Sequence, residues 1–295
     1  MTKPLILPYK LLIWDIETRH LQANIWRPGE QVVRHGQLVP GHEQYQILTI
    51  SYKWYGQAKV YTLDYKDPDM IAKFDAVIRQ ADVSLGKNSD NFDIKHINTQ
   101  RMMQGLKPFP EWLDSVDDLQ KQLKKYFAFP SQSLDYISTI MGFGGKEKME
   151  MSDWVDIDNY KQISEFEAVI SYTTSSSLIN DVCKFFFKDS YRNIITKGRV
   201  ALKKMTFYNQ KDVLATEAIL IKVLPYITLK HNTSTAKDGV SCSLCGSSKI
   251  LPTQIITKGK QRYQQFDCLE HRGYAGKATV SYDKNRNKVF GKISN

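Results

Sequence analysis

The stretch LLIWDIETR, residues 11–19, places two acids at the end of a run of large apolar residues. Successive side chains of a strand face opposite ways, so Asp15 and Glu17 point to the same side. A carboxylate in apolar surroundings is costly unless a charge or a hydrogen bond compensates it. Residues 9–17 therefore predict a strand, mostly buried on both faces, that presents two hard oxygen ligands to a cation.

The segments that follow this strand alternate between strand-like and helical patterns. Gly56-Gln57 separates two β-rich runs and is typical of a hairpin turn. The pattern predicts strands over 46–55, 58–63, 81–86 and 113–117, helices over 68–80, 93–104, 131–141 and 200–223, and helical, partly flexible sequence over 147–200. This order predicts an α/β domain in which helices cover a mixed β-sheet.

Three further residues match the acids of the first strand in type and order. Asp93 begins a predicted helix just after a short strand, and Tyr208 precedes Asp212 by four residues on a predicted helix, so both lie on one helical face. Each has an ordinary structural explanation: Asp93 as a first-turn acid, Tyr208 and Asp212 as an amphipathic edge. Their joint occurrence in this order favours a shared site.

The positive charge is concentrated in the C-terminal part of the chain. Of the net charge of +10, residues 228–295 carry +8, with 12 Lys and Arg against 4 Asp and Glu. A basic appendage on a near-neutral body is typical of a protein that binds a polyanion, although a solubilising surface would have the same composition. No apolar run reaches the roughly 20 residues that span a membrane, and the N-terminus lacks a signal-peptide pattern, which predicts a cytoplasmic protein.

The same basic segment contains four residues with the spacing of zinc ligands. Cys242-x-x-Cys245 is followed after 22 residues by a second pair, Cys268-x-x-His271, and short β-like runs lie between and after the pairs. Three thiolates and one imidazole would close a tetrahedral structural Zn²⁺ site, so the spacing predicts a zinc ribbon; the alternative is free thiols. Cys183 is predicted to be a buried packing residue.

Together the three blocks resemble the DEDDy group of 3′→5′ exonucleases. The blocks are Asp15-x-Glu17, Asn88-x-x-x-Phe92-Asp93 and Tyr208-x-x-x-Asp212. They are similar to the proofreading exonuclease domain of family-B DNA polymerases, and FPSQSLDYISTIMGFGGK (129–146) resembles that family's segment between its second and third blocks. The later LPYI resembles the stand-alone, phage-like branch. The resemblance covers about residues 8–227. It implies an RNase H-like fold and phosphodiester hydrolysis at the 3′ end of DNA, single-stranded or frayed.

The resemblance also implies a role for each site residue. Asp15 would bridge two Mg²⁺ or Mn²⁺ ions, Glu17 and Asp212 would complete the site of the metal that activates water, and Asp93 would hold the second metal. Tyr208 would orient the attacking water. Substrate contacts are implied for Asn88 and Phe92. Four carboxylates so close together are expected to raise at least one pKa in the absence of metal.

Residues 1–227 are thus predicted to form the exonuclease domain, 228–239 a linker, and 240–295 a zinc-ribbon domain that binds nucleic acid or docks on a protein of replication or recombination. Two alternatives remain open from the sequence. One is a 3′→5′ RNA exonuclease, because the acidic pattern does not distinguish RNA from DNA. The other is a nucleic-acid-binding recruitment factor that acts through the zinc ribbon.

Overall fold

The protein is described here by a computed structural model. It describes residues 7, 10–27, 29–30, 32–42, 44–81, 83–107, 117–145, 148–170, 176–227, 229, 242, 249–259, 261–269, 273–282 and 288–290. A mixed five-stranded sheet forms the centre, with strand order β3-β2-β1-β4-β5. Its strands are β1 (Leu11–Thr18), β2 (Ile47–Trp54), β3 (Tyr61–Asp64), β4 (Val83–Gly86) and β5 (Asp117–Asp118). The α/β prediction of a mixed sheet flanked by helices is confirmed, and this arrangement is compatible with an RNase H-like fold.

Strand β1 lies in the middle of the sheet and makes both kinds of pairing. It runs antiparallel to β2, with Asp15 opposite Ser51, and parallel to β4. The alternation along β1 divides its side chains between two apolar clusters. Leu12, Trp14 and Ile16 pack on one face, while Leu11 and Ile13 pack on the other. Asp15 and Glu17 continue the second set, so they emerge on the face that bears the helix α7 (Tyr191–Val223).

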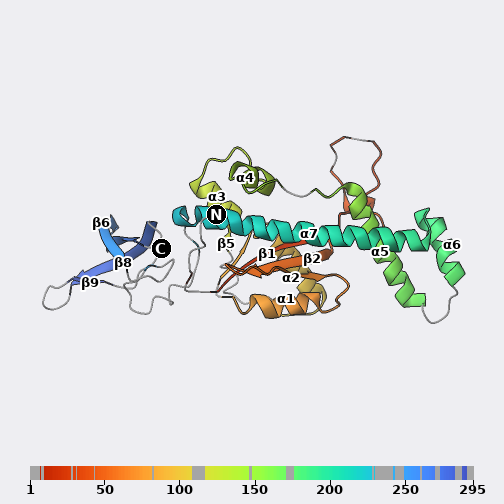
Figure 1. Ribbon diagram of the computed structural model, residues 1–295, viewed down its shortest axis with the longest axis horizontal. Helices are drawn as coiled ribbons and strands as arrows, with labels where there is room; N and C mark the ends of the chain where they lie inside the picture. The colour runs from red at the N-terminus through yellow and green to blue at the C-terminus, as the bar shows by residue number, and fades with distance from the viewer. Residues whose placement is uncertain are drawn as a thin grey trace.

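Helices cover both faces of the sheet (Figure 1). The cluster of Leu12, Trp14 and Ile16 is covered by α1 (Met70–Ile78) and α2 (Asp93–Met103), where the ring of Phe74 lies 5.1 Å from that of Trp14. The other face meets α3 (Leu119–Tyr126), α4 (Leu134–Ile140) and α7 (Tyr191–Val223). The sequence reading missed α3. The strand predicted at 113–117 lies outside the described residues except for its last position, where β5 begins.

The helix α7 is longer than the sequence predicts. It begins at Tyr191, where the Ser190 hydroxyl accepts a hydrogen bond from the Asn193 N–H at 3.3 Å, and runs for 33 residues. Gly198 lies inside it, which is why the sequence pattern places the helix start near residue 200. A side chain at Gly198 would meet Cβ of Tyr160 at 2.2 Å, so this glycine allows α5 (Met151–Ile170) to cross α7 closely.

An arm of helices projects beyond the sheet (Figure 1). It consists of α5, α6 (Ser176–Phe187) and the first half of α7, and agrees with the helical prediction for this region. A buried ionic cluster fixes its base. Asp158 of α5 lies 2.5 Å from Arg19 Nε and 3.1 Å from His42 Nε2, and each of the three residues is at most 5 % exposed. The arm is therefore joined to the residues that follow the acids of β1.

The chain ends in a second, antiparallel sheet of four strands in the order β6-β7-β8-β9. Its strands are β6 (Ile250–Lys258), β7 (Gln261–Cys268), β8 (Gly273–Tyr282) and β9 (Lys288–Phe290). Phe266, Ala275 and Ala278 join the same apolar cluster as Ile227, which follows the short 3₁₀ helix η3 (Leu224–Tyr226) at the end of α7. The predicted linker 228–239 lies outside the described residues except for Leu229. The domain boundaries therefore stay predictions.

The loop between β1 and β2 contains a short 3₁₀ helix, η1 (His35–Gln37). None of the helices in the described part of the chain is both long enough and apolar enough to cross a bilayer.

Candidate metal centre and active site

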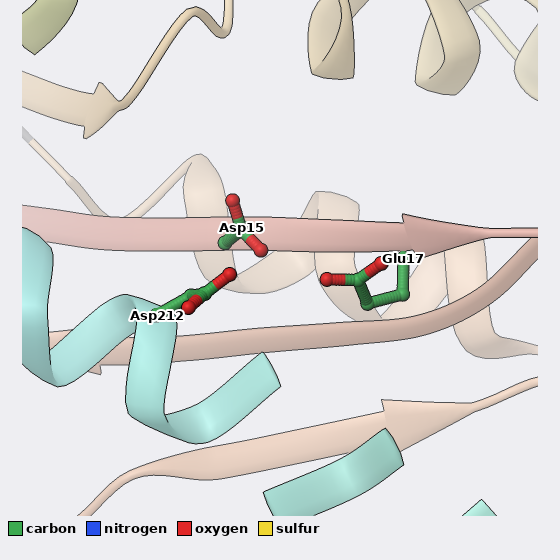
Figure 2. A group of neighbouring side chains, drawn as sticks. All are labelled: Asp15, Glu17 and Asp212. Carbon is green, nitrogen blue, oxygen red and sulfur yellow. The ribbon is translucent and has the colours of Figure 1, made fainter. Parts of the chain in front are cut away.

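Three carboxylates from two distant segments meet on the α7 side of the sheet (Figure 2). Asp15 and Glu17 come from β1, and Asp212 comes from α7. One possible ligand atom from each residue can be chosen so that all three lie within 4.8 Å of one another. Asp212 is only 4 % exposed, while Asp15 and Glu17 are half-buried. The group could therefore hold a metal ion, with one side toward solvent.

Asn209 fixes the first of these carboxylates, and the sequence analysis missed it. Its side-chain amide donates to Asp15 Oδ2 at 2.7 Å, and its Oδ1 accepts from the Thr49 hydroxyl at 3.2 Å. Asn209 is 0 % exposed, so neither bond competes with water. The only sequence signal would have been a polar residue on the buried face of α7. The amide holds one oxygen of Asp15 and thereby orients the carboxylate.

Asp93 lies in the same pocket but outside the group of three. It begins α2, is 3 % exposed, and its Oδ1 accepts the backbone N–H of Ile16 at 3.1 Å. This bond ties the start of α2 to the residue between Asp15 and Glu17. Burial raises the pKa of Asp93 to about 7, and the neighbouring Asp118 adds to the effect. The expected direction is thus present, but desolvation is its main cause rather than repulsion among the four site acids.

All seven residues singled out in the sequence line one pocket of about 290 Å³. They are Asp15, Glu17, Asn88, Phe92, Asp93, Tyr208 and Asp212. Tyr208 lies one helical turn before Asp212, as its spacing predicts, and is half-buried. The structure therefore brings the predicted residues together, while their roles in catalysis stay predictions.

The loop that carries Asn88 is held by two residues that the sequence did not indicate. Asp118 Oδ1 accepts the N–H of Asn88 and the N–H of Gln120, both at 2.8 Å, and so also caps α3. Gln120 donates to Asn88 Oδ1 at 3.1 Å and accepts from Lys87 at 3.1 Å. Asn88 has φ = 64°, a left-handed conformation that asparagine tolerates better than most residues. The network sets the position of the Asn88 side chain at the pocket wall.

Phe92 forms the outer wall of the pocket. Its ring packs edge-on against His96 at 4.3 Å, and His96 in turn meets Tyr45 at 4.7 Å. Phe92 is 37 % exposed although its ring packs against His96. The exposed part of the ring is available to a substrate, and burial lowers the pKa of His96 below its ordinary value.

The donor set fits a hard divalent cation. Carboxylate oxygens are the ligands that Mg²⁺ and Mn²⁺ prefer, and the site offers no thiolate or imidazole among the three clustered residues. Asp93 lies in the same pocket and adds a fourth carboxyl group beside them. The residues present therefore fit the predicted metal type.

Only half of the predicted zinc site falls within the described residues. Cys242 and Cys268 are both 1 % exposed and belong to the apolar cluster that joins the C-terminal sheet to Ile227. Cys245 and His271 lie outside the described residues, so zinc binding stays a prediction. Cys183 is 0 % exposed in the arm and packs with Ile163 and Ile194.

Comparison with known proteins adds little to this geometry. No family model matches the chain, and no curated protein matches it. Among solved structures, the family B DNA polymerase from the hyperthermophilic archaeon Pyrobaculum calidifontis matches with a TM-score of 0.46 and 14 % identity. The match covers 74 % of this chain and 25 % of the polymerase, so this chain spans about a quarter of that protein. At this level the likeness is distant and carries no argument about activity.

Proposed function

We propose that the protein is a metal-dependent 3′→5′ exonuclease that acts on DNA, at single-stranded or frayed 3′ ends, and releases nucleotides. One observation carries the proposal: carboxylates of Asp15, Glu17 and Asp212 that lie within 4.8 Å of one another, in a pocket shared with Asp93 and Tyr208. The sequence resemblance to DEDDy exonucleases, with its RNase H-like fold, supports the same assignment.

Asp15, Glu17 and Asp212 would hold one Mg²⁺ or Mn²⁺ ion, and Asp93 with Asp15 would hold a second. Two such ions supply an activated water and stabilise the leaving oxygen of a phosphodiester. A buried Asp93 that retains its proton in the absence of cation would release that proton when metal binds, because the cation favours the carboxylate form.

The remaining residues would place the substrate and the water. The hydroxyl of Tyr208 would orient the attacking water, since Tyr208 lies one turn from Asp212 along α7. The ring of Phe92 would pack against the terminal nucleotide, and Asn88, fixed by Asp118 and Gln120, would make a polar contact to it. Asn209 acts through Asp15, so it is a positioning residue.

The size of the pocket is consistent with cleavage at a chain end. About 290 Å³ lies at the lower limit of small-molecule sites, so the pocket suits a single terminal nucleotide. A strand would therefore be consumed one nucleotide at a time.

The test is digestion of a 5′-labelled single-stranded DNA oligomer with Mn²⁺, using wild type, Asp212→Asn and the control Asp181→Asn. Asp181 is an exposed acid on α6, far from the site in the sequence and on another helix. A ladder that shortens from the 3′ end in wild type and control, and is absent in Asp212→Asn, is expected. A ladder in all three would show that the site is misplaced. If the protein digests a matched RNA oligomer and leaves the DNA oligomer intact, it is an RNA exonuclease.

For the C-terminal sheet we propose a structural Zn²⁺ site formed by Cys242, Cys245, Cys268 and His271, in a domain that binds nucleic acid or a protein partner. Burial of Cys242 and Cys268 beside one strand of this sheet supports it. The purified protein should contain one zinc per chain by atomic absorption, and Cys268→Ser should lose it. Wild-type protein that contains no zinc would contradict the site.

A further inference from the structure

The exposed face of α7 carries a row of basic residues that leads to the acidic pocket. Residues three or four apart in a helix lie above one another, so exposed positions at this spacing form one stripe. We name this stripe the α7 track and define it by the exposed residues Arg192, Arg199, Lys203, Phe207 and Lys211. Lys211 and the pocket residue Asp212 together line a second cavity, so the track ends beside the acidic pocket.

The track keeps its positive charge. Between Ser176 and Lys211 the chain has eight Lys and Arg against two Asp. On the same helix, Lys197 pairs with Asp189 at 2.7 Å and Lys204 with Asp153 at 2.5 Å, so these two cations are neutralised. Within the described parts of the chain, no ion pair is found for Arg192, Lys203 or Lys211. An anion would therefore meet uncompensated charge at these three positions of the track.

An exposed aromatic ring lies among these cations. Phe207 is 48 % exposed, and Lys211 Nζ lies 5.1 Å from its ring centroid. Single-stranded nucleic acid offers both phosphates and unstacked bases, and bases stack on exposed aromatic rings. A duplex offers mainly phosphates along its surface. The exposed ring of Phe207 thus favours a single strand.

We propose that the α7 track binds the phosphate backbone of a single-stranded nucleic acid whose 3′ end lies in the acidic pocket. This inference rests on the proposed function for the direction of the strand. Arg192 lies 19 residues before Lys211, a distance of roughly 28 Å at 1.5 Å per residue. A strand stacked at the duplex spacing of roughly 3.4 Å per nucleotide would place about eight nucleotides along the track, and an extended single strand would place fewer. Figure 1 shows α7 running without a break from the body into the arm.

The test measures binding separately from cleavage. The probe is a 5′-fluorescein oligothymidylate of 20 nucleotides, followed by fluorescence anisotropy in EDTA over a range of salt concentrations. The variant is Arg192→Gln with Lys203→Gln, two exposed helix positions where glutamine preserves the helix. Loss of two phosphate contacts should reduce the slope of log K against log salt by about 1.4 and weaken binding about 25-fold at 0.1 M salt.

The matched control removes the same charge on the other side of the sheet. Lys95→Gln with Lys107→Gln changes exposed cations of α2 and of the segment after it, and binding should stay within about twofold of wild type because salt screens such distant charges. Equal weakening in both double variants would refute the track. Tighter wild-type binding of a blunt 20-base-pair duplex, lost in the Arg192/Lys203 variant, would refute the single strand as occupant.

A second measurement keeps this inference distinct from the exonuclease proposal. A dinucleotide cannot reach from the pocket to Lys203, so its hydrolysis with Mn²⁺ should be the same in wild type and in the Arg192/Lys203 variant. Reduced dinucleotide hydrolysis in the variant would show a defect in the site itself and overturn the inference. If wild type cleaves no substrate at all, the exonuclease proposal fails, while the anisotropy result in EDTA still decides whether the track binds a strand.

Discussion

The buried ion pair between Lys53 and Glu217 gives a sharp test of how α7 is fixed to the sheet. Lys53 of β2 is 2 % exposed, Glu217 of α7 is 8 % exposed, and Lys53 Nζ hydrogen-bonds to Glu217 Oε2. Glu217 Oε1 also accepts the N–H of Gly56 at 2.8 Å. Glu217 lies five residues after Asp212, so this contact sets the position of the helix that carries a proposed metal ligand.

The perturbation is Lys53→Met, which keeps an unbranched side chain one atom shorter and removes its charge. The carboxylate of Glu217 is then buried with one backbone donor and no cation. Removing one partner of a buried pair costs about 3–5 kcal/mol of unfolding free energy, whereas an apolar replacement of both partners is close to neutral. Lys53→Met with Glu217→Met should therefore regain most of the loss, to within about 1 kcal/mol of wild type.

Urea denaturation followed by circular dichroism measures Lys53→Met, Glu217→Met and the double variant. The exposed pair of Lys73 with Asp67 is the matched control, and Lys73→Met should cost less than about 1 kcal/mol because exposed pairs contribute little. The reasoning is refuted if Lys53→Met costs no more than Lys73→Met. It is also refuted if the losses of the two single changes at 53 and 217 simply add.

Three further predictions follow from the site and the arm. In metal-free protein the pKa of folded Asp93 is about 7, above its ordinary 3.8, so between these values the folded chain holds a proton that the unfolded chain releases. The free energy of unfolding should therefore fall as pH rises from about 4 to about 7. Urea titrations in EDTA should show this slope in wild type and a weaker slope in Asp93→Asn. Gly198→Ala forces a Cβ to within 2.2 Å of Cβ of Tyr160 and should cost about 1–3 kcal/mol, and an unchanged midpoint would contradict the close crossing of α5 and α7. Mn²⁺ at about 100 times its Kd should stabilise wild type by about 2.7 kcal/mol in thermal denaturation, and Asp15→Asn should lose most of this gain.

The sequence predicted the parts of the site that follow from local pattern. Period-two alternation places Asp15 and Glu17 on one face of β1, and helical spacing places Tyr208 with Asp212, and the structure has both arrangements. Asn209 and Asp118 were missed because their partners are 194 and 30 residues away in the chain. Only the packing of α7 on β1, and of β5 beside β4, brings these polar groups to the pocket.

Charge and helix length show a similar limit. The net charge of residues 1–227 is close to zero. The basic row along α7 is therefore not visible in the net charge, because acids elsewhere in the fold balance it. The start of α7 was placed too late because glycine normally weakens a helix, whereas Gly198 is required by the contact with Tyr160. Tertiary contacts determine both the basic row on α7 and the start of this helix, and the propensities of single residues carry no information about such contacts.

The unbroken length of α7 makes the helix a mechanical lever. Asp212 lies 21 residues from the first residue of α7, roughly 31 Å along the axis at 1.5 Å per residue. A tilt of the helix that shifts the arm by several ångströms would displace Asp212 by only a fraction of that, if the pivot lies close to the Lys53–Glu217 pair. A ligand bound on the arm and a cation at the carboxylates would thus contact the same helix. Where the ligand changes the affinity for the cation, thermodynamic linkage requires that the cation change the affinity for the ligand by the same factor.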